Sequence, residues 1–256
     1  MTSVNHSVAM VRALLGYLPG RRRLKSVNFD HLDEFVSYVD DQILPATTDL
    51  NNLAKTSRKH VQKLVYTNLV DRFDVTIDQS LLSNCREEPL LEAAIKRMDQ
   101  GINEGDLIRL LMLGSDLESA INERIQSSIR NHELRARHSK KVGTWLRVCR
   151  MEEKSLKSNR VNSANGEILK TFKQQEKTTP ASILGYTDWL YSRRNAVVHG
   201  GNARILLANN VSQLKSLYGC RPAKTYSLTL GSIKVAAHFY KSLVALAKDG
   251  VPESEA

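Results

Sequence analysis

Apolar residues recur at intervals of three and four positions along most of this chain, which is the spacing of one face of an α-helix. The clearest stripes lie at 32–43, 61–73, 90–98, 107–129, 183–191 and 233–246. Alternating runs of β-branched residues, which are typical of strands, hardly occur, and aromatic residues make up only 6% of the chain. The pattern therefore predicts an all-α fold.

Proline, glycine and capping residues predict where these helices begin and end. Pro45 is expected to end the first helix, since proline disrupts a helix interior, and Thr56 is expected to cap the second. Pro89 and Pro180 are expected to open later helices, because proline is tolerated in a first turn. The pair Gly200–Gly201 is expected to stop the helix that follows Pro180.

The distribution of charge suggests a division of the chain. We expect an N-terminal basic segment at 1–26, a helical domain at 27–250 and a tail at 251–256. Within the domain, 132–177 holds twelve Lys and Arg against five Glu, which is +7 of the total net charge of +10. One interpretation is a solvated insertion or linker. The other is a basic arm that engages phosphates, with Trp145 either stacking on a base or anchoring the arm to the core.

Net charge and cysteine usage limit the partners and the compartment. A balance of +10 favours a polyanion such as nucleic acid or an acidic membrane surface. No apolar run approaches the roughly 20 residues that span a bilayer, so no membrane partner is expected. The three cysteines are isolated, and the apolar stretch near the N-terminus precedes its basic cluster, the reverse of a signal peptide. We therefore expect a reduced, cytoplasmic protein.

One motif carries recognisable chemistry. Residues 191–201 read YSRRNAVVHGG and follow an apolar helical stretch. The run from Arg194 to Gly200 resembles the HEPN superfamily, whose signature is an arginine, four to six residues and then a histidine. This resemblance implies a HEPN-like helical bundle, here with extra helices and the basic insertion. A fixed Arg-to-His spacing is weak by itself, and the structural alternative is an ordinary helix C-terminus that attracts cations.

The residue types suit metal-free RNA cleavage. Histidine, with an ordinary pKa of about 6.5, transfers protons at neutral pH, so His199 is the candidate acid or base. Arg194 offers a planar, permanently charged fork to phosphate oxygens. Asn195 lies one turn before His199 and is expected to orient it or to contact phosphate. The histidines are scattered, with no metal-binding motif, so neither a metal nor another cofactor is expected.

Further candidates support these residues. The resemblance implies an acidic residue on an earlier helix, and Asp71 is the candidate that would orient His199 or tune its pKa. Asp74 fits the spacing equally well, and the structural alternative for Asp71 is a surface ion pair. Arg193 either binds phosphate or is an ordinary surface residue. Three residues of the basic segment complete the predicted substrate-binding set: Lys140, Lys141 and Arg147.

The geometry of the motif predicts a second copy of the chain. Residues five apart on a helix lie about 140° apart around its axis and about 7.5 Å apart along it. Arg194 and His199 would then face different directions unless the helix breaks between them. The resemblance implies the other solution, a homodimer whose two motifs share one cleft.

The expected function is a metal-independent HEPN endoribonuclease that acts on RNA. The resemblance implies a toxin or anti-phage defence effector, with an antitoxin or a defence complex as a further partner. One alternative is a non-catalytic HEPN-like RNA-binding or scaffold protein within a defence complex. Another is a nucleic-acid-binding regulator driven by charge, which would bind in a salt-dependent manner without cleavage.

Overall fold

The computed structural model describes residues 27–98, 105, 109, 112, 117–174, 177–199, 206–223 and 227–250. The described chain is mostly helical, with one short hairpin as its sheet, which confirms the predicted all-α class. In chain order the helices are α2 (Asp30–Tyr38), the π-helical turn η1 (Val39–Ile43), α3 (Leu44–Asp49), the 3-10 turn η2 (Leu50–Asn52), α4 (Lys55–Ser83), α5 (Leu90–Met98), α7 (Leu117–His132), α8 (His138–Val148), α9 (Glu153–Lys157), α10 (Ile183–His199), α11 (Ala208–Tyr218) and α12 (Leu230–Asp249). The antiparallel strands are β1 (Val161–Asn162) and β2 (Glu167–Ile168).

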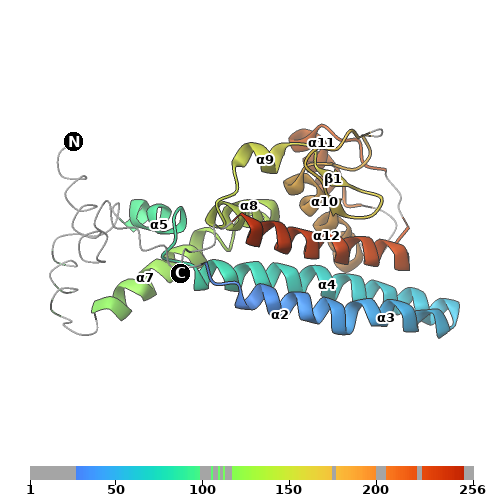
Figure 1. Cartoon of the computed structure of the whole chain (residues 1–256), viewed down its shortest axis with the longest axis horizontal. Coiled ribbons are helices and arrows are strands. Elements are labelled where there is room, and N and C mark those ends of the chain that lie inside the picture. Colours follow the sequence, from blue (N-terminus) through green and yellow to red (C-terminus); the bar gives the residue numbers. More distant parts are fainter. Residues whose placement is uncertain are drawn as a thin grey trace.

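The 29-residue helix α4 is the axis of the molecule. Helices α2 and α3 run along one side of it and α12 along another, while α8 and α10 cross it (Figure 1). An aromatic cluster joins these layers: the Phe73 ring of α4 stacks on Tyr240 of α12 with centroids 4.1 Å apart, and it meets Phe35 of α2 at 5.2 Å. All three rings are fully buried, so the core lies where α2, α4 and α12 meet.

Three predicted helix boundaries are wrong. Helix α10 begins at Ile183, so Pro180 precedes it and does not lie in its first turn. The first helix passes through Pro45 instead of ending before it. Proline lacks an N–H and crowds the carbonyl four residues earlier, and the wider π-turn at Val39–Ile43 relieves that conflict. Helix α4 begins at Lys55 with Ala54 as N-cap, so Thr56 lies within the first turn and caps nothing. The helices expected after Pro89 and at 233–246 are present, whereas Gly200–Gly201 and most of 106–116 lie outside the described residues.

The segment at 132–177 is not an appended arm. Helix α8 lies within it and packs against α4 and α10. Trp145 is fully buried, and its ring meets Phe73 at 6.3 Å, so it anchors the segment to the core and is not available for stacking on a base. The following hairpin packs on α12, where Gly166 adopts φ +80° against the backbone of Val235.

A large core runs from Val27 to Ala247, and a smaller cluster joins α10 to α11, whereas the bounds of the expected domain at 27–250 stay a prediction. The predicted segments at 1–26 and 251–256 lie outside the described residues. Cys85, Cys149 and Cys220 are all free thiols and all buried. In the described part of the chain, no helix combines the length and the apolar content that crossing a bilayer requires.

Candidate functional site

The Arg-to-His motif lies on one unbroken helix. Helix α10 runs from Ile183 through His199, so the chain does not break between Arg194 and His199. On such a helix the two side chains leave about 140° apart, so they point in different directions. His199 is exposed in the last turn, where the helix dipole favours a positive charge.

Arg194 is held in place by three neighbours. Its Nε donates to Oδ1 of Asp71 on α4 at 2.6 Å, and its Nη1 donates to Oδ1 of Asn195 at 3.2 Å. The guanidinium carbon also lies 5.6 Å from the centroid of the Tyr191 ring. Among the described residues, these two oxygens are the acceptors found for its five N–H donors. The remaining donors suit an anionic ligand.

Arg194 stays positively charged. Burial lowers the pKa of Arg194, but the hydrogen bond and the charge of Asp71 outweigh this effect, and the pKa lies above its ordinary value. The Arg194 side chain is 19% exposed and that of Asp71 is 42% exposed, so the pair lies at the surface without being fully solvated. A cation that is oriented by one carboxylate and still partly open is suited to bind phosphate.

The expected role of Asp71 therefore needs correction. Asp71 contacts Arg194, which lies 123 positions away in sequence, and no contact of Asp71 with His199 is found among the described residues. Likewise Asn195 accepts a hydrogen bond from Arg194. The structure thus brings Asp71, Arg194 and Asn195 together and leaves His199 apart from them.

Asp74, the alternative acid, belongs to a second network. Its Oδ1 accepts from Nδ1 of His138 at 2.5 Å and lies 2.7 Å from Nζ of Lys141. The same Nζ donates to Oδ1 of Asp78 at 2.7 Å. Burial raises the pKa of Asp74. The hydrogen bonds and charges of His138 and Lys141 outweigh this effect and lower the pKa to about 2. These groups form a compact ionic network between α4 and α8.

The two networks meet at Tyr191. The His138 ring stacks on Tyr191 with centroids 4.5 Å apart and an interplanar angle of 11°. Tyr191 in turn lies beside the Arg194 guanidinium. The buried His138 network therefore fixes one wall of the Arg194 site, a role that its place in a polar, charged segment did not indicate.

Two predicted substrate-binding residues are buried, so those predictions are wrong. Lys141 is 4% exposed and is occupied by Asp74 and Asp78. Arg193 is also 4% exposed. Its guanidinium lies 4.5 Å from the centroid of Trp189, and its Nη2 donates to the carbonyl of Ser227 at 3.1 Å. Both side chains hold helices together instead of facing a ligand.

The other two predicted substrate-binding residues remain accessible. Lys140 is exposed in the first turn of α8. Arg147 is exposed near the end of that helix, and its Nη2 donates to Oγ1 of Thr144 at 3.1 Å. Their contact with a substrate stays a prediction.

The acidic, histidine and cysteine side chains of the described residues are not grouped as metal ligands. Within the described ranges, no group of three or more His, Cys, Asp or Glu residues is placed to hold a metal ion. The carboxylates of Asp71 and Asp74 on α4 instead form ion pairs with Arg194 and Lys141. Comparison of the chain with protein-family models, curated proteins and solved structures finds no significant match, so the resemblance to HEPN proteins rests on the sequence motif alone.

Proposed function

We propose that this protein is a metal-independent endoribonuclease of HEPN type that cleaves RNA as a homodimer. The observation that carries the proposal is the 2.6 Å contact between Arg194 Nε and Asp71 Oδ1. This contact orients the guanidinium group and leaves other N–H donors of Arg194 for a phosphate. An arginine that only capped a helix end would not require a carboxylate from another helix to orient it.

The chemistry requires one Arg194 and two histidines. One His199 takes the proton from the 2′-hydroxyl, and the 2′-oxygen attacks phosphorus. The bond from phosphorus to the 5′-oxygen breaks, and the second His199, in its protonated form, gives a proton to that oxygen. Arg194 neutralises the charge that develops on the phosphate oxygens. The products are a 2′,3′-cyclic phosphate and a free 5′-hydroxyl.

The proposed dimer explains why apolar side chains are exposed near the site. Leu64, Asp71 and Val75 lie on one face of α4, and Val198 lies one turn after Arg194 on α10. The three apolar side chains are 54%, 48% and 47% exposed, respectively. A second copy covering these residues would remove them from water and would bring its own motif to the same place. The second copy would thereby supply the second His199.

The test is cleavage of total RNA in the presence of EDTA. Wild-type protein is expected to cleave, and Arg194→Ala and His199→Ala are each expected to lower the rate by roughly 10²-fold or more. Arg130→Ala/His132→Ala, which removes an exposed arginine and histidine from α7, is the matched control and is expected to cleave as wild type does. Equal cleavage by wild type and His199→Ala would overturn the mechanism.

Mixing the inactive variants tests the shared cleft. Dimers formed from one Arg194→Ala copy and one His199→Ala copy keep one histidine, whereas the mechanism needs two, so they are expected to stay inactive. Dimers of one Arg194→Ala copy and one wild-type copy keep both histidines and one arginine, so activity is expected to return. Light scattering measures whether the protein is dimeric. Tight, salt-dependent RNA binding without cleavage would instead favour the non-catalytic RNA-binding alternative. A role as a toxin or defence effector, with its neutralising or complex partner, follows from the same proposal.

A further inference from the structure

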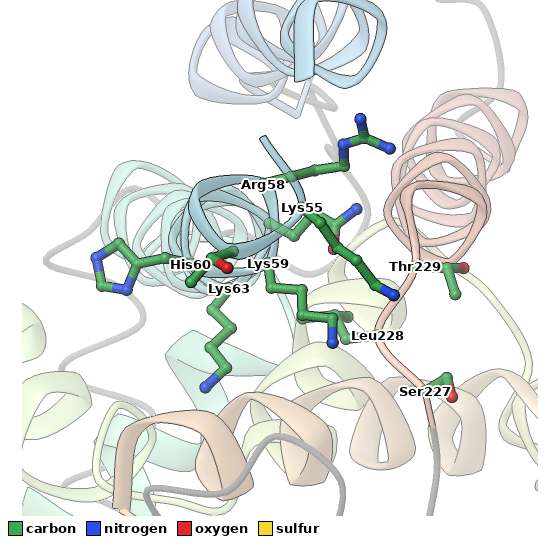
Figure 2. Close-up of a pocket in the computed structure, with 10 residues that line it drawn as sticks. Lys55, Arg58, Lys59, His60, Lys63, Ser227, Leu228 and Thr229 are labelled. Carbon is green, nitrogen blue, oxygen red and sulfur yellow. The ribbon is translucent and has the colours of Figure 1, made fainter. Parts of the chain in front are cut away.

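A second polar feature lies at the start of α4, apart from the Arg194 pair. A cavity of about 650 Å³ opens between the first turns of α4 and the segment that leads into α12. Figure 2 shows Lys55 and Lys59 reaching from α4 towards Leu228 and Thr229, while Arg58 points away. The volume lies within the range of about 300–1,000 Å³ that is typical of small-ligand sites.

Among the residues that the structure describes, none compensates the charge in this cavity. None of the lining residues is acidic, and within the described chain no carboxylate forms an ion pair with Lys55, Lys59 or Lys63. The other half of the same helix is different, since Asp71 and Asp74 there are paired with cations from α10 and α8. Helix α4 thus carries a neutralised acidic half and an uncompensated basic half.

This basic cluster is unfavourable for the free helix. Lys55, Lys59 and Lys63 are spaced four residues apart, so like charges lie along one line of the helix. Lys55 also lies in the first turn, where the dipole favours anions, and that turn contains no acidic residue and no side-chain cap. Residues that oppose local stability in this way are expected where a ligand compensates them.

The neighbouring polar groups leave room for a ligand. The Nη2 of Arg58 donates to the carbonyls of Asn51 and Leu53 at 2.7 and 2.9 Å, so Arg58 is structural. Gln62 is only 8% exposed and lines the cavity, yet its amide has no hydrogen-bond partner among the described residues. The Gln62 amide is not among the fully buried polar atoms that lack a partner, so it is open to the cavity and available to a ligand.

We propose that this cavity binds adjacent phosphate groups, such as those of a nucleoside polyphosphate or of an RNA strand. The three lysines supply the positive charge, and the Gln62 amide donates a hydrogen bond to a phosphate oxygen. Ser227 lies on the opposite wall of the cavity. Its carbonyl accepts a hydrogen bond from the buried Arg193, which holds that wall in position. The proposal does not depend on the chemistry of Arg194 and His199.

The experiment measures binding and not cleavage. The full chain carrying His199→Ala is titrated with ATP, with inorganic tripolyphosphate and with a fluorescent 12-nucleotide RNA. Lys55→Gln/Lys59→Gln/Lys63→Gln in the same background is expected to lose roughly tenfold or more in affinity. For RNA, removing three phosphate contacts is also expected to flatten the slope of log K against log salt by about 2.

Two comparisons separate a local site from a general effect of charge. Lys96→Gln/Lys154→Gln/Lys215→Gln removes the same charge from exposed positions on α5, α9 and α11 and is expected to bind nearly as the parent does. Gln62→Leu leaves the charge unchanged and is expected to weaken binding several-fold. Because the lysines repel one another, the cavity variant is expected to fold at least as stably as the parent without ligand, and tripolyphosphate is expected to raise the Tm of the parent alone.

Each outcome decides the question. Binding of ATP and tripolyphosphate that is lost in the cavity variant supports a free nucleotide as the ligand. Binding of RNA alone, lost in the same variant, supports an RNA strand. If no probe binds the parent, or if the cavity variant and the charge-matched control bind alike, the proposal is overturned whether or not the protein cleaves RNA.

Discussion

Arg193 and Arg194 are adjacent on α10, yet truncating each to alanine is expected to have opposite consequences. Arg193 is 4% exposed, its guanidinium lies 4.5 Å from the Trp189 ring centroid, and its Nη2 donates to Ser227. A desolvated cation–π contact contributes about 1–2 kcal/mol, and a hydrogen bond to a charged group contributes about 1.5–3 kcal/mol. Arg193→Ala is therefore expected to lower the free energy of unfolding by about 3 kcal/mol.

Arg194→Ala is expected to change stability much less. Its partner Asp71 is 42% exposed, so solvent screens the pair, and such surface ion pairs contribute about 0.2–1 kcal/mol. Thermal unfolding followed by circular dichroism separates the two cases. At about 2–4 °C per kcal/mol for a domain of this size, Arg193→Ala is expected to lower Tm by roughly 6–12 °C and Arg194→Ala by no more than about 4 °C.

Activity is expected to follow the reverse order. Arg194→Ala is expected to abolish RNA cleavage while remaining folded, whereas Arg193→Ala is expected to retain measurable cleavage at temperatures well below its own Tm. Arg193→Lys keeps the charge but loses the planar contact with Trp189, so its stability is expected to lie between those of Arg193→Ala and wild type. If Arg193→Ala melted within about 2 °C of wild type, or if Arg194→Ala melted as low as Arg193→Ala, the assignment of the two roles would be wrong.

Three other regions give further predictions. Because the pKa of Asp74 is about 2 in the folded state, below its ordinary value of 3.8, its stabilising contribution is complete above about pH 4 and is lost as the pH falls towards 2. Urea unfolding is expected to show a loss of about 2 kcal/mol over that interval, and a flatter profile for Asp74→Asn. Lys141→Met strands the carboxylates that it pairs and is expected to lower the free energy of urea unfolding by roughly 3–5 kcal/mol, whereas no change would contradict the buried network. Gly166→Ala is expected to lower Tm strongly, because a Cβ there would collide with the Val235 carbonyl. Gly219→Ala is the matched control: its φ is also positive, but nothing lies within 4 Å of the added carbon, so its cost is about 1–2 kcal/mol of backbone strain.

The sequence was most informative where one face of a helix is apolar. Helix α12 was readable because its buried side chains follow helical spacing and none of them is charged. Helix α8 was missed because it buries His138 and Lys141 beside its apolar residues. The partners that satisfy these two residues lie on α4, more than 60 positions earlier, so no local pattern reveals that the charges are buried.

The candidate site stays a prediction, and the contacts of its residues could be anticipated only in part. The motif pointed to Arg194 and His199, and the resemblance to HEPN proteins drew attention to Asp71. Which acid meets which base depends on how α4 crosses α10, and the spacing of residues along the chain does not contain that information. The structure pairs Asp71 with Arg194 and gives Asp74 to His138. The lysines at the start of α4 form no sequence motif, and only the position of the segment before α12 shows that they line a cavity.

The burial of all three thiols has a practical consequence for testing subunit association. Burial raises the pKa of Cys85 and Cys220, and raises that of Cys149 to about 12, so little reactive thiolate exists at neutral pH. The folded protein is therefore expected to resist maleimide labelling without any cysteine being removed. A cysteine introduced at Val198, which is 47% exposed, would then be the single reactive position of each chain. A pair of spin labels attached there would report directly how far apart two copies hold their α10 helices.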